Sequence, residues 1–194
     1  MQGTDGFLVE RLLVGASASI GVTNLLDYLS TMRFLQVARE IQVIMTDKAA
    51  RMIPPTTVEA LCKSRVYTDF YEPGTGRVLH IELAQWADFF LILPASANLL
   101  AKAAHGIGDD LLSTTIIAST SPLAFVPNMN SVMMNKPAIQ RNIKQLREDG
   151  YAIIDPVMQV GYQASTGKRI EAPCMPQVAD LRLRMAEILE QGSA

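Results

Sequence analysis

The chain has 194 residues, of which 49% are hydrophobic and 19% are charged. This length and composition predict one domain with a sizeable core and exclude a disordered chain. The net charge of −2 gives no basic footprint for nucleic acid and no electrostatic membrane anchor.

The two cysteines, Cys62 and Cys174, are too few for a disulfide framework and lack the spacing of a zinc site. We therefore expect no metal and a reducing compartment. The N-terminus lacks the basic and apolar regions of a signal peptide. Ser, Thr, Asn or Pro interrupts the longest apolar runs, so none is suited to span a bilayer. The sequence predicts a cytoplasmic protein without a transmembrane segment.

The first predicted unit consists of a strand at Arg11–Val14, a loop of small residues at Gly15–Ser19 and a helix from about Gly21 to Arg33. Free backbone N–H groups at the start of a helix attract anions, so this loop is a candidate phosphate cradle. The glycine spacing excludes a P-loop and a dinucleotide fingerprint but is compatible with a mononucleotide phosphate. The alternative is a tight turn that needs small residues.

The second predicted strand is Ile41–Met45, and Thr46 at its end would bring a hydroxyl to the same edge of the sheet as the first loop. Thr56 and Glu59 have the spacing of a capping box for a short helix. After a Gly-rich turn, another short helix at Ile81–Ala87 leads into the central strand.

The most informative stretch starts with the apolar run Phe89–Leu93, which has the length of a strand buried on both faces of a parallel sheet. Pro94 is predicted to end this strand. A loop of small residues follows, and Asn98 is predicted to cap a helix that Gly106 closes. Ligands of open α/β sheets bind at the carboxyl ends of strands, so this loop is a candidate binding site. An ordinary strand–loop–helix turn is the alternative.

The remaining chain continues the alternation of strands and helices. We predict a helix at Asp109–Thr115, a strand at Ala124–Val126, a helix that Asn135 caps, a strand at Tyr151–Ile154, a long irregular segment over residues 155–176 and a final helix at Gln177–Glu190. Long irregular segments of compact domains are often functional lids. The alternation predicts a single three-layer α/β domain over residues 1–194.

Two motifs carry a resemblance to a known family. PASAN at residues 94–98 precedes Lys102, Ala104, Gly106, Asp109, Leu111 and Leu112, and PNMNSVM at residues 127–133 precedes Met134. The first pattern resembles the PASAN-type motif of the flavin-containing cysteine decarboxylases, and the second resembles their PxMNxxMW motif with Met134 in place of Trp. This homo-oligomeric family includes the peptidyl-cysteine decarboxylases of lantibiotic, linaridin and thioamide-peptide biosynthesis. It also includes the phosphopantothenoylcysteine decarboxylases.

The resemblance covers nearly the whole chain. It implies a Rossmann-like, flavodoxin-type parallel sheet with helices on both faces, and FMN as the cofactor. The first loop and Thr46 would hold the FMN phosphate, while the PASAN loop and the start of the following helix would line the flavin ring. The implied FMN-binding residues are Gly15, Ala16, Ser17, Ser19, Thr46, Pro94, Ala95, Ser96, Ala97, Asn98, Ser113, Thr114 and Met133.

His80 and Asn130 are the implied catalytic residues. A histidine near neutrality would help to form the thiolate of a cysteine substrate, and the Asn130 amide would orient the carboxylate that leaves. The alternatives are a satisfied polar histidine and an asparagine that completes a turn. His105 has the position of a helix-terminal residue, and Cys174 that of a small packed side chain.

Residues 155–176 lie where the peptide-type members have a substrate clamp, and strand addition would be the physical mode of peptide recognition. The implied substrate-binding residues are Asn128, Met129, Pro156, Met158, Ser165, Thr166 and Gly167. The implied homotrimers, which often assemble into dodecamers, hold FMN at a subunit interface. His80 and the PASAN loop are therefore expected to meet across chains.

The sequence thus predicts an FMN-dependent oxidative decarboxylase of the C-terminal cysteine of a ribosomal precursor peptide. The cysteine would lose a hydride to FMN and then carbon dioxide, which leaves an aminoenethiol, the precursor of aminovinyl-cysteine. The first alternative is the phosphopantothenoylcysteine decarboxylase of coenzyme A biosynthesis, which a fused ligase domain and a Gly-rich Cys loop would favour. A flavin prenyltransferase and a catalytically silent flavin-binding subunit are further alternatives.

Overall fold

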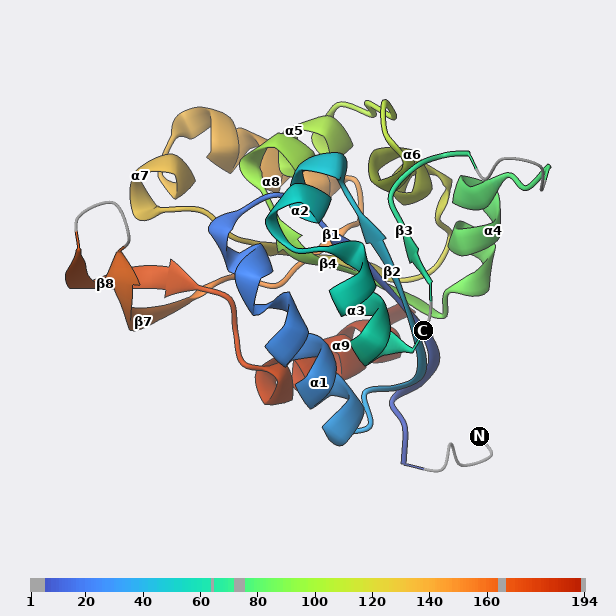
Figure 1. Ribbon diagram of the computed structural model, residues 1–194. Coiled ribbons are helices and arrows are strands. Elements are labelled where there is room, and N and C mark those ends of the chain that lie inside the picture. Colours follow the sequence, from blue (N-terminus) through green and yellow to red (C-terminus); the bar gives the residue numbers. More distant parts are fainter. Residues whose placement is uncertain (1–5, 64, 72–75, 164–166, 193–194) are drawn as a thin grey trace.

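A parallel sheet of six strands forms the centre of the computed structural model, which describes residues 6–63, 65–71, 76–163 and 167–192 (Figure 1). The strand order is β3-β2-β1-β4-β5-β6. These strands are β1 Val9–Ala16, β2 Ala38–Met45, β3 Val66–Tyr67, β4 Phe89–Ala95, β5 Leu123–Pro127 and β6 Ala152–Ile153. The predicted flavodoxin-type α/β fold is confirmed.

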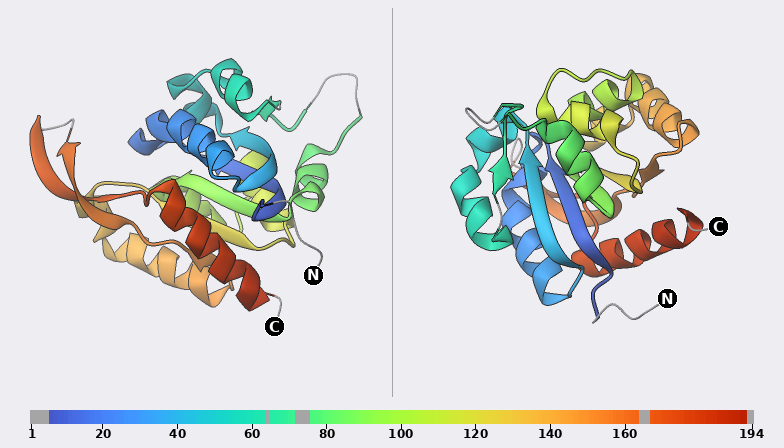
Figure 2. Two further views of the ribbon diagram at one scale, coloured as in Figure 1. Left: turned by 90° about the horizontal axis from the view of Figure 1, so that it is seen from below. Right: turned by 90° about the vertical axis from the view of Figure 1, so that its right-hand side faces the viewer.

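Helices cover both faces of the sheet, as the two views of Figure 2 show. Their bounds are η1 Ile20–Asn24, α1 Leu25–Phe34, α2 Asp47–Met52, α3 Pro55–Cys62, α4 Leu79–Trp86, α5 Ala97–Ala104, α6 Leu111–Ala118, α7 Ser131–Met134, α8 Pro137–Glu148 and α9 Val178–Gly192. Within the described ranges, every helix is too short or too polar to cross a membrane.

The sheet separates two hydrophobic cores because successive side chains of a strand point to opposite faces. Phe89 and Leu91 of β4 pack in one core with α1, α3 and α9. Phe90 and Ile92 pack in the other core with α4, α5, α6 and α8. All seven residues of β4 are buried, as the unbroken apolar run predicts.

The segment 155–176 is not irregular, so that part of the prediction is wrong. It contains an antiparallel hairpin of β7 Val157–Gln163 and β8 Lys168–Cys174, in which Val157 pairs with Cys174. Met158 and Val160 of β7 are 57% and 75% exposed. Because this ribbon packs no complete face against a core, its sequence lacks the alternation that predicts a half-buried strand. In Figures 1 and 2 the hairpin projects from one end of the molecule and α4 lies at the other.

The boundaries around PASAN also differ from the prediction. Strand β4 continues through Pro94 to Ala95, with a register shift against β5 between Ile92 and Ala95. A strand tolerates proline at such an irregularity because the missing N–H leaves no ladder bond unmade. Helix α5 then starts at Ala97, and its N-cap is Ser96, whose Oγ accepts from Leu99 N at 3.4 Å. Asn98 is therefore not the cap.

Two further predicted caps are wrong for local reasons. Helix α3 starts at Pro55, so Thr56 lies inside it, and the Glu59 carboxylate accepts from Val66 N at 3.0 Å instead of closing a capping box. Asn135 follows α7, and the residue that precedes α8 is Lys136. Proline in the first turn marks both helix starts more reliably than the polar residues beside it.

Other predicted elements are shifted by a few residues. The first helix is split into the 3-10 turn η1 and α1, and α6 starts at Leu111 behind its cap Asp110. Helix α4 starts at Leu79, so His80 lies in its first turn and not before it.

Candidate active site

The loops after β1 and β4 are joined by the hydroxyl of Ser17. Its Oγ donates to Pro94 O at 2.9 Å and accepts from Ser96 N at 2.8 Å, while Ser17 N also donates to Pro94 O at 3.1 Å. Ser17 is only 2% exposed. Its side chain, which the sequence assigns to a phosphate, therefore holds two loops of the chain together.

The loop after β5 joins the same assembly through Asn128. The Asn128 Oδ1 accepts from Ser19 Oγ at 2.8 Å and from Gly21 N at 3.1 Å, and its backbone N donates to Ala95 O at 2.9 Å. Strands β1, β4 and β5 are neighbours in the sheet, so their loops meet at one edge, as the sequence predicts. We call these hydrogen-bonded residues, Ser17, Ser19, Gly21, Pro94, Ala95, Ser96 and Asn128, the loop junction.

Gly15 and Ala16 belong to β1, so the loop starts at Ser17 and not at Gly15. A Cβ on Gly15 would lie 2.5 Å from Leu112 Cδ1 and 2.8 Å from Ile92 Cδ1. The missing side chain of Gly15 therefore allows α6 to pack against the sheet. This close packing is enough to explain a glycine at position 15, so no ligand contact is needed to account for it.

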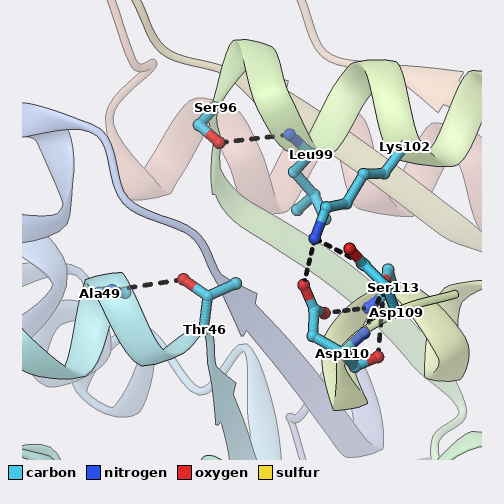
Figure 3. Close-up of polar contacts among 8 residues, drawn as sticks. All are labelled: Thr46, Ala49, Ser96, Leu99, Lys102, Asp109, Asp110 and Ser113. Atoms are coloured by element: carbon cyan, nitrogen blue, oxygen red, sulfur yellow. Dashed lines mark hydrogen bonds and ion pairs between the residues drawn. The ribbon is translucent and has the colours of Figure 1, made fainter. Parts of the chain in front are cut away.

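Thr46 lies at the end of β2, as predicted. Its backbone N donates to Ala16 O at 3.0 Å, and its Oγ1 caps α2 by accepting from Ala49 N at 3.3 Å (Figure 3). The hydroxyl hydrogen of Thr46 is not used in this cap. Thr46 can therefore still donate to a ligand beside the β1 loop.

Helices α5 and α6 are connected by an ion-pair cluster, which Figure 3 shows. The Lys102 side chain is 18% exposed, and its ammonium lies 2.5 Å from Asp109 and 2.7 Å from Asp110. Burial opposes its charge, but the hydrogen bonds to both carboxylates outweigh burial and raise the pKa of Lys102. Hydrogen bonding from Lys102 lowers the pKa of Asp109. The sequence includes Lys102 and Asp109 in the PASAN pattern but assigns them no role.

Asp110 also caps α6 and binds Ser113 reciprocally. Its Oδ1 accepts from Ser113 N at 2.8 Å, and the Ser113 Oγ accepts from Asp110 N at 3.1 Å. The next residue, Thr114, has a buried Oγ1 that lacks a hydrogen-bond partner in the described part of the chain. A buried unpaired hydroxyl is costly, so it marks a place where a ligand group fits. This orphaned hydroxyl could pair with a cofactor, whereas the side chain of Ala95, also predicted to contact FMN, is fully buried.

The structure separates the two predicted catalytic residues. His80 lies in the first turn of α4 and contacts the Phe70 ring edge-on, with ring centroids 6.0 Å apart. Asn130 caps the short helix α7, where its Oδ1 accepts from Met133 N at 2.8 Å. This cap is the turn role given as the alternative for Asn130, yet it leaves the amide NH₂ group available as a donor.

The predicted substrate residues lie on two elements. Met129 is buried behind β5, whereas Pro156 and Met158 lie at the start of the hairpin and Gly167 lies in its turn with φ 67°. The predicted substrate residues Ser165 and Thr166 fall outside the described residues. Predicted FMN contact Met133 is 42% exposed on α7.

The base of the hairpin is fixed to α1. The Tyr28 hydroxyl donates to Pro176 O at 2.8 Å and lies 3.2 Å from Met175 O. Burial, with a smaller effect of Cys174, raises the pKa of Tyr28 to about 12. Cys174 itself ends β8 and is half-buried, as expected for a packed side chain.

Comparisons with known proteins agree with this geometry. The family model described as Flavoprotein matches residues 8–181. Mersacidin decarboxylase of Bacillus sp. (strain HIL-Y85/54728) is 39% identical over 160 residues, which cover 82% of this chain and 80% of that protein. The coenzyme A biosynthesis bifunctional protein CoaBC of Bacillus subtilis (strain 168) is 43% identical over 147 residues, or 74% of this chain, which spans only 36% of the bifunctional protein.

Two solved structures are similar over most of their length. The crystal structure of the FMN-dependent cysteine decarboxylase SpaF has a TM-score of 0.78 at 36% identity, covering 95% of this chain and 98% of that one. A variant of EpiD complexed with the substrate peptide DSYTC has a TM-score of 0.81 at 28% identity, covering 89% and 95%.

Proposed function

Because the chain belongs to the Flavoprotein family, we propose that it binds FMN and decarboxylates the C-terminal cysteine of a precursor peptide of the lantibiotic type. The loop junction carries this proposal, since it fixes three loops of small residues around one edge of the sheet. The named relatives include FMN-dependent cysteine decarboxylases, and one of them is complexed with a peptide that ends in cysteine.

Two features of the described chain support this FMN site. Thr46 and the β1 loop lie at the same sheet edge and would hold the phosphate, while the orphaned Thr114 hydroxyl would pair with the ring system. Bound FMN would supply the two-electron oxidation that converts the cysteine side chain to a thioaldehyde. Departure of carbon dioxide then sends an electron pair into the C=S group and gives the aminoenethiolate.

Asn130 would orient the carboxylate that leaves. Its Oδ1 is occupied by Met133 N, so the NH₂ group is the end that faces a ligand. A neutral amide holds a carboxylate less tightly than an arginine would, which favours its loss. His80 would take the thiol proton, because a cysteine thiol has a pKa of about 8.5 and is mostly protonated at neutral pH.

We propose that His80 acts in the site of another subunit. Helix α4 lies at the opposite end of the molecule from the hairpin (Figure 1), and the α4–α6 surface exposes Val78, Ile81 and Ile117 at 52%, 39% and 49%. A mixture of inactive His80→Asn and inactive Asn130→Ala proteins, dissociated and reassembled, should regain turnover. If the site were complete within one chain, the mixture would remain inactive.

The peptide activity is tested by product mass. The purified protein is incubated with FMN and short cysteine-terminated peptides, and the expected product has lost carbon dioxide and two hydrogens. The second candidate is phosphopantothenoylcysteine decarboxylation, which the 43% identity to CoaBC favours. Loss of carbon dioxide alone from phosphopantothenoylcysteine, without reaction of any peptide, would establish that candidate instead.

A further inference from the structure

Asn128 is predicted from the sequence to bind substrate, but its side-chain hydrogen bonds join it to the segment that follows β1. Its Oδ1 accepts two hydrogen bonds, from Ser19 Oγ and Gly21 N, and both donors belong to the segment that follows β1. We propose that Asn128 is a positioning residue that holds Ser19 and Gly21, at the end of the proposed phosphate-binding loop, in place and does not contact the peptide. This inference rests on the proposed FMN site.

The amide orientation follows from these contacts. Only the carbonyl oxygen of an asparagine accepts from both a hydroxyl and a backbone N–H, so the two donors fix which end of the side chain faces the β1 loop. Asn128 also ties the third loop to the second, because its backbone N donates to Ala95 O at 2.9 Å. One residue therefore joins all three loops of the junction.

Gly21 shows how closely the two segments fit. A Cβ on Gly21 would lie 2.6 Å from Asn128 Oδ1, 2.8 Å from Asn128 Cγ and 2.9 Å from Met175 Cε. Met175 follows β8 and is 6% exposed. The absence of a side chain at Gly21 thus allows the β1 loop, the β5 loop and the base of the hairpin to meet.

The consequence concerns the Ser19 hydroxyl. The Ser19 O–H and the Gly21 N–H donate to Asn128, and the Ser19 N–H donates to Ser17 O at 2.9 Å, so these donors fix the conformation of the β1 loop and are not themselves offered to a phosphate. A loop that is held in one conformation before binding takes up its ligand with a smaller loss of chain entropy. Removing the Asn128 amide should therefore weaken FMN binding first, and peptide binding only as far as FMN is missing.

The test compares Asn128→Ala, Ser19→Ala and the double variant with the wild type. The FMN dissociation constant is measured by quenching of flavin fluorescence on the apoprotein, and the peptide KM is measured at saturating FMN. Loss of two hydrogen bonds should weaken FMN binding by about tenfold in Asn128→Ala, with the peptide KM within about twofold of wild type. The double variant should bind FMN no more weakly than Asn128→Ala, because both substitutions break the same contact.

Thr23→Ala is the matched control. It removes a hydroxyl from the same 3-10 turn, but the Thr23 Oγ1 donates to Ile20 O and is exposed. FMN binding of this variant should be unchanged. If Asn128→Ala fails to fold, Ser19→Ala tests the same contact, because it removes the Ser19 hydroxyl and keeps the Asn128 side chain.

A peptide KM raised more than about fivefold in Asn128→Ala, with FMN affinity unchanged, would overturn the proposal and establish a substrate contact. Fully additive effects of the two substitutions on FMN binding would overturn it as well. The readout is separate from the proposed reaction, because a wild-type protein that binds FMN but leaves peptides unchanged would refute the peptide activity and still allow this comparison.

Discussion

The loop junction and the β7–β8 hairpin are both candidate ligand-binding regions, but they are built in opposite ways. In the loop junction, polar side chains form hydrogen bonds with other loops of the same chain, and Ser17 is almost fully buried. In the hairpin, Met158 and Val160 point outward with no core behind them. A rigid junction suits a cofactor that all turnovers share, whereas an exposed ribbon suits a variable peptide.

Ser17→Ala should have the largest effect, because it breaks the junction at its buried centre. The substitution leaves Ser96 N without the Ser17 Oγ, its acceptor at 2.8 Å. A buried donor that loses its partner costs about 2 kcal/mol. We expect that loss in the free energy of unfolding, measured with urea, together with strongly weakened FMN binding.

The control for this variant is Ser30→Ala, since Ser30 is exposed on α1. Its free energy of unfolding should change by less than about 0.5 kcal/mol. Equal stability of the two variants would mean that the Ser17 contacts do not support the junction.

Substitutions in the hairpin should instead weaken peptide binding and leave the free energy of unfolding unchanged. Met158 and Val160 are two residues apart on β7 and therefore share one face of the ribbon. Replacing both by serine removes apolar contact with a bound peptide, which we expect to raise the peptide KM by about tenfold. The free energy of unfolding and FMN affinity should stay unchanged, because both side chains are exposed.

Gln159 lies between these two residues and faces the other side of the ribbon. Gln159→Ser should therefore leave the peptide KM unchanged. An equal rise of KM in both variants would show that the ribbon is needed as a whole and not through one face.

The contrast also explains what the sequence could predict. Strand β4, the helices that follow it and the carboxyl edge where the loops meet follow from apolar runs and small residues, which depend on local chemistry. The side chains that join the loops do not: Ser17 contacts residue 96 and Ser19 contacts residue 128, so neither pairing leaves a local pattern. The sequence does not predict the hairpin for a different reason, since a ribbon that packs no complete face against a core has no clear hydrophobic period.

Lys102→Met should have an intermediate effect on the free energy of unfolding, and this effect should depend on pH. The lowered pKa of Asp109 means that its ion pair with Lys102 stabilises the fold above the unfolded pKa of about 3.9 and that this stabilisation is lost as pH falls through the lower folded value. The variant lacks the pair and should be less stable at pH 7 by about 1 kcal/mol. The difference in unfolding free energy between variant and wild type should shrink below about pH 4. A difference that stays constant from pH 7 to pH 3 would contradict this role.

Tyr28→Phe should have the smallest effect, and it tests whether the hairpin depends on the body of the protein. The substitution removes the hydrogen bond to Pro176 O and should lower the free energy of unfolding by about 0.5 kcal/mol. The Tyr28 pKa of about 12 lies above the unfolded value of about 10. A raised pKa of this kind stabilises the fold fully below pH 10, and the stabilisation is lost as pH rises towards 12. Wild type should therefore lose stability in that window more steeply than Tyr28→Phe.

Tyr71→Phe is the matched control, because Tyr71 is 82% exposed and its loss should change neither stability nor the alkaline slope. If Tyr28→Phe raised the peptide KM as well, the hairpin would take its position from α1, and the two regions would be coupled through the residues around Met175.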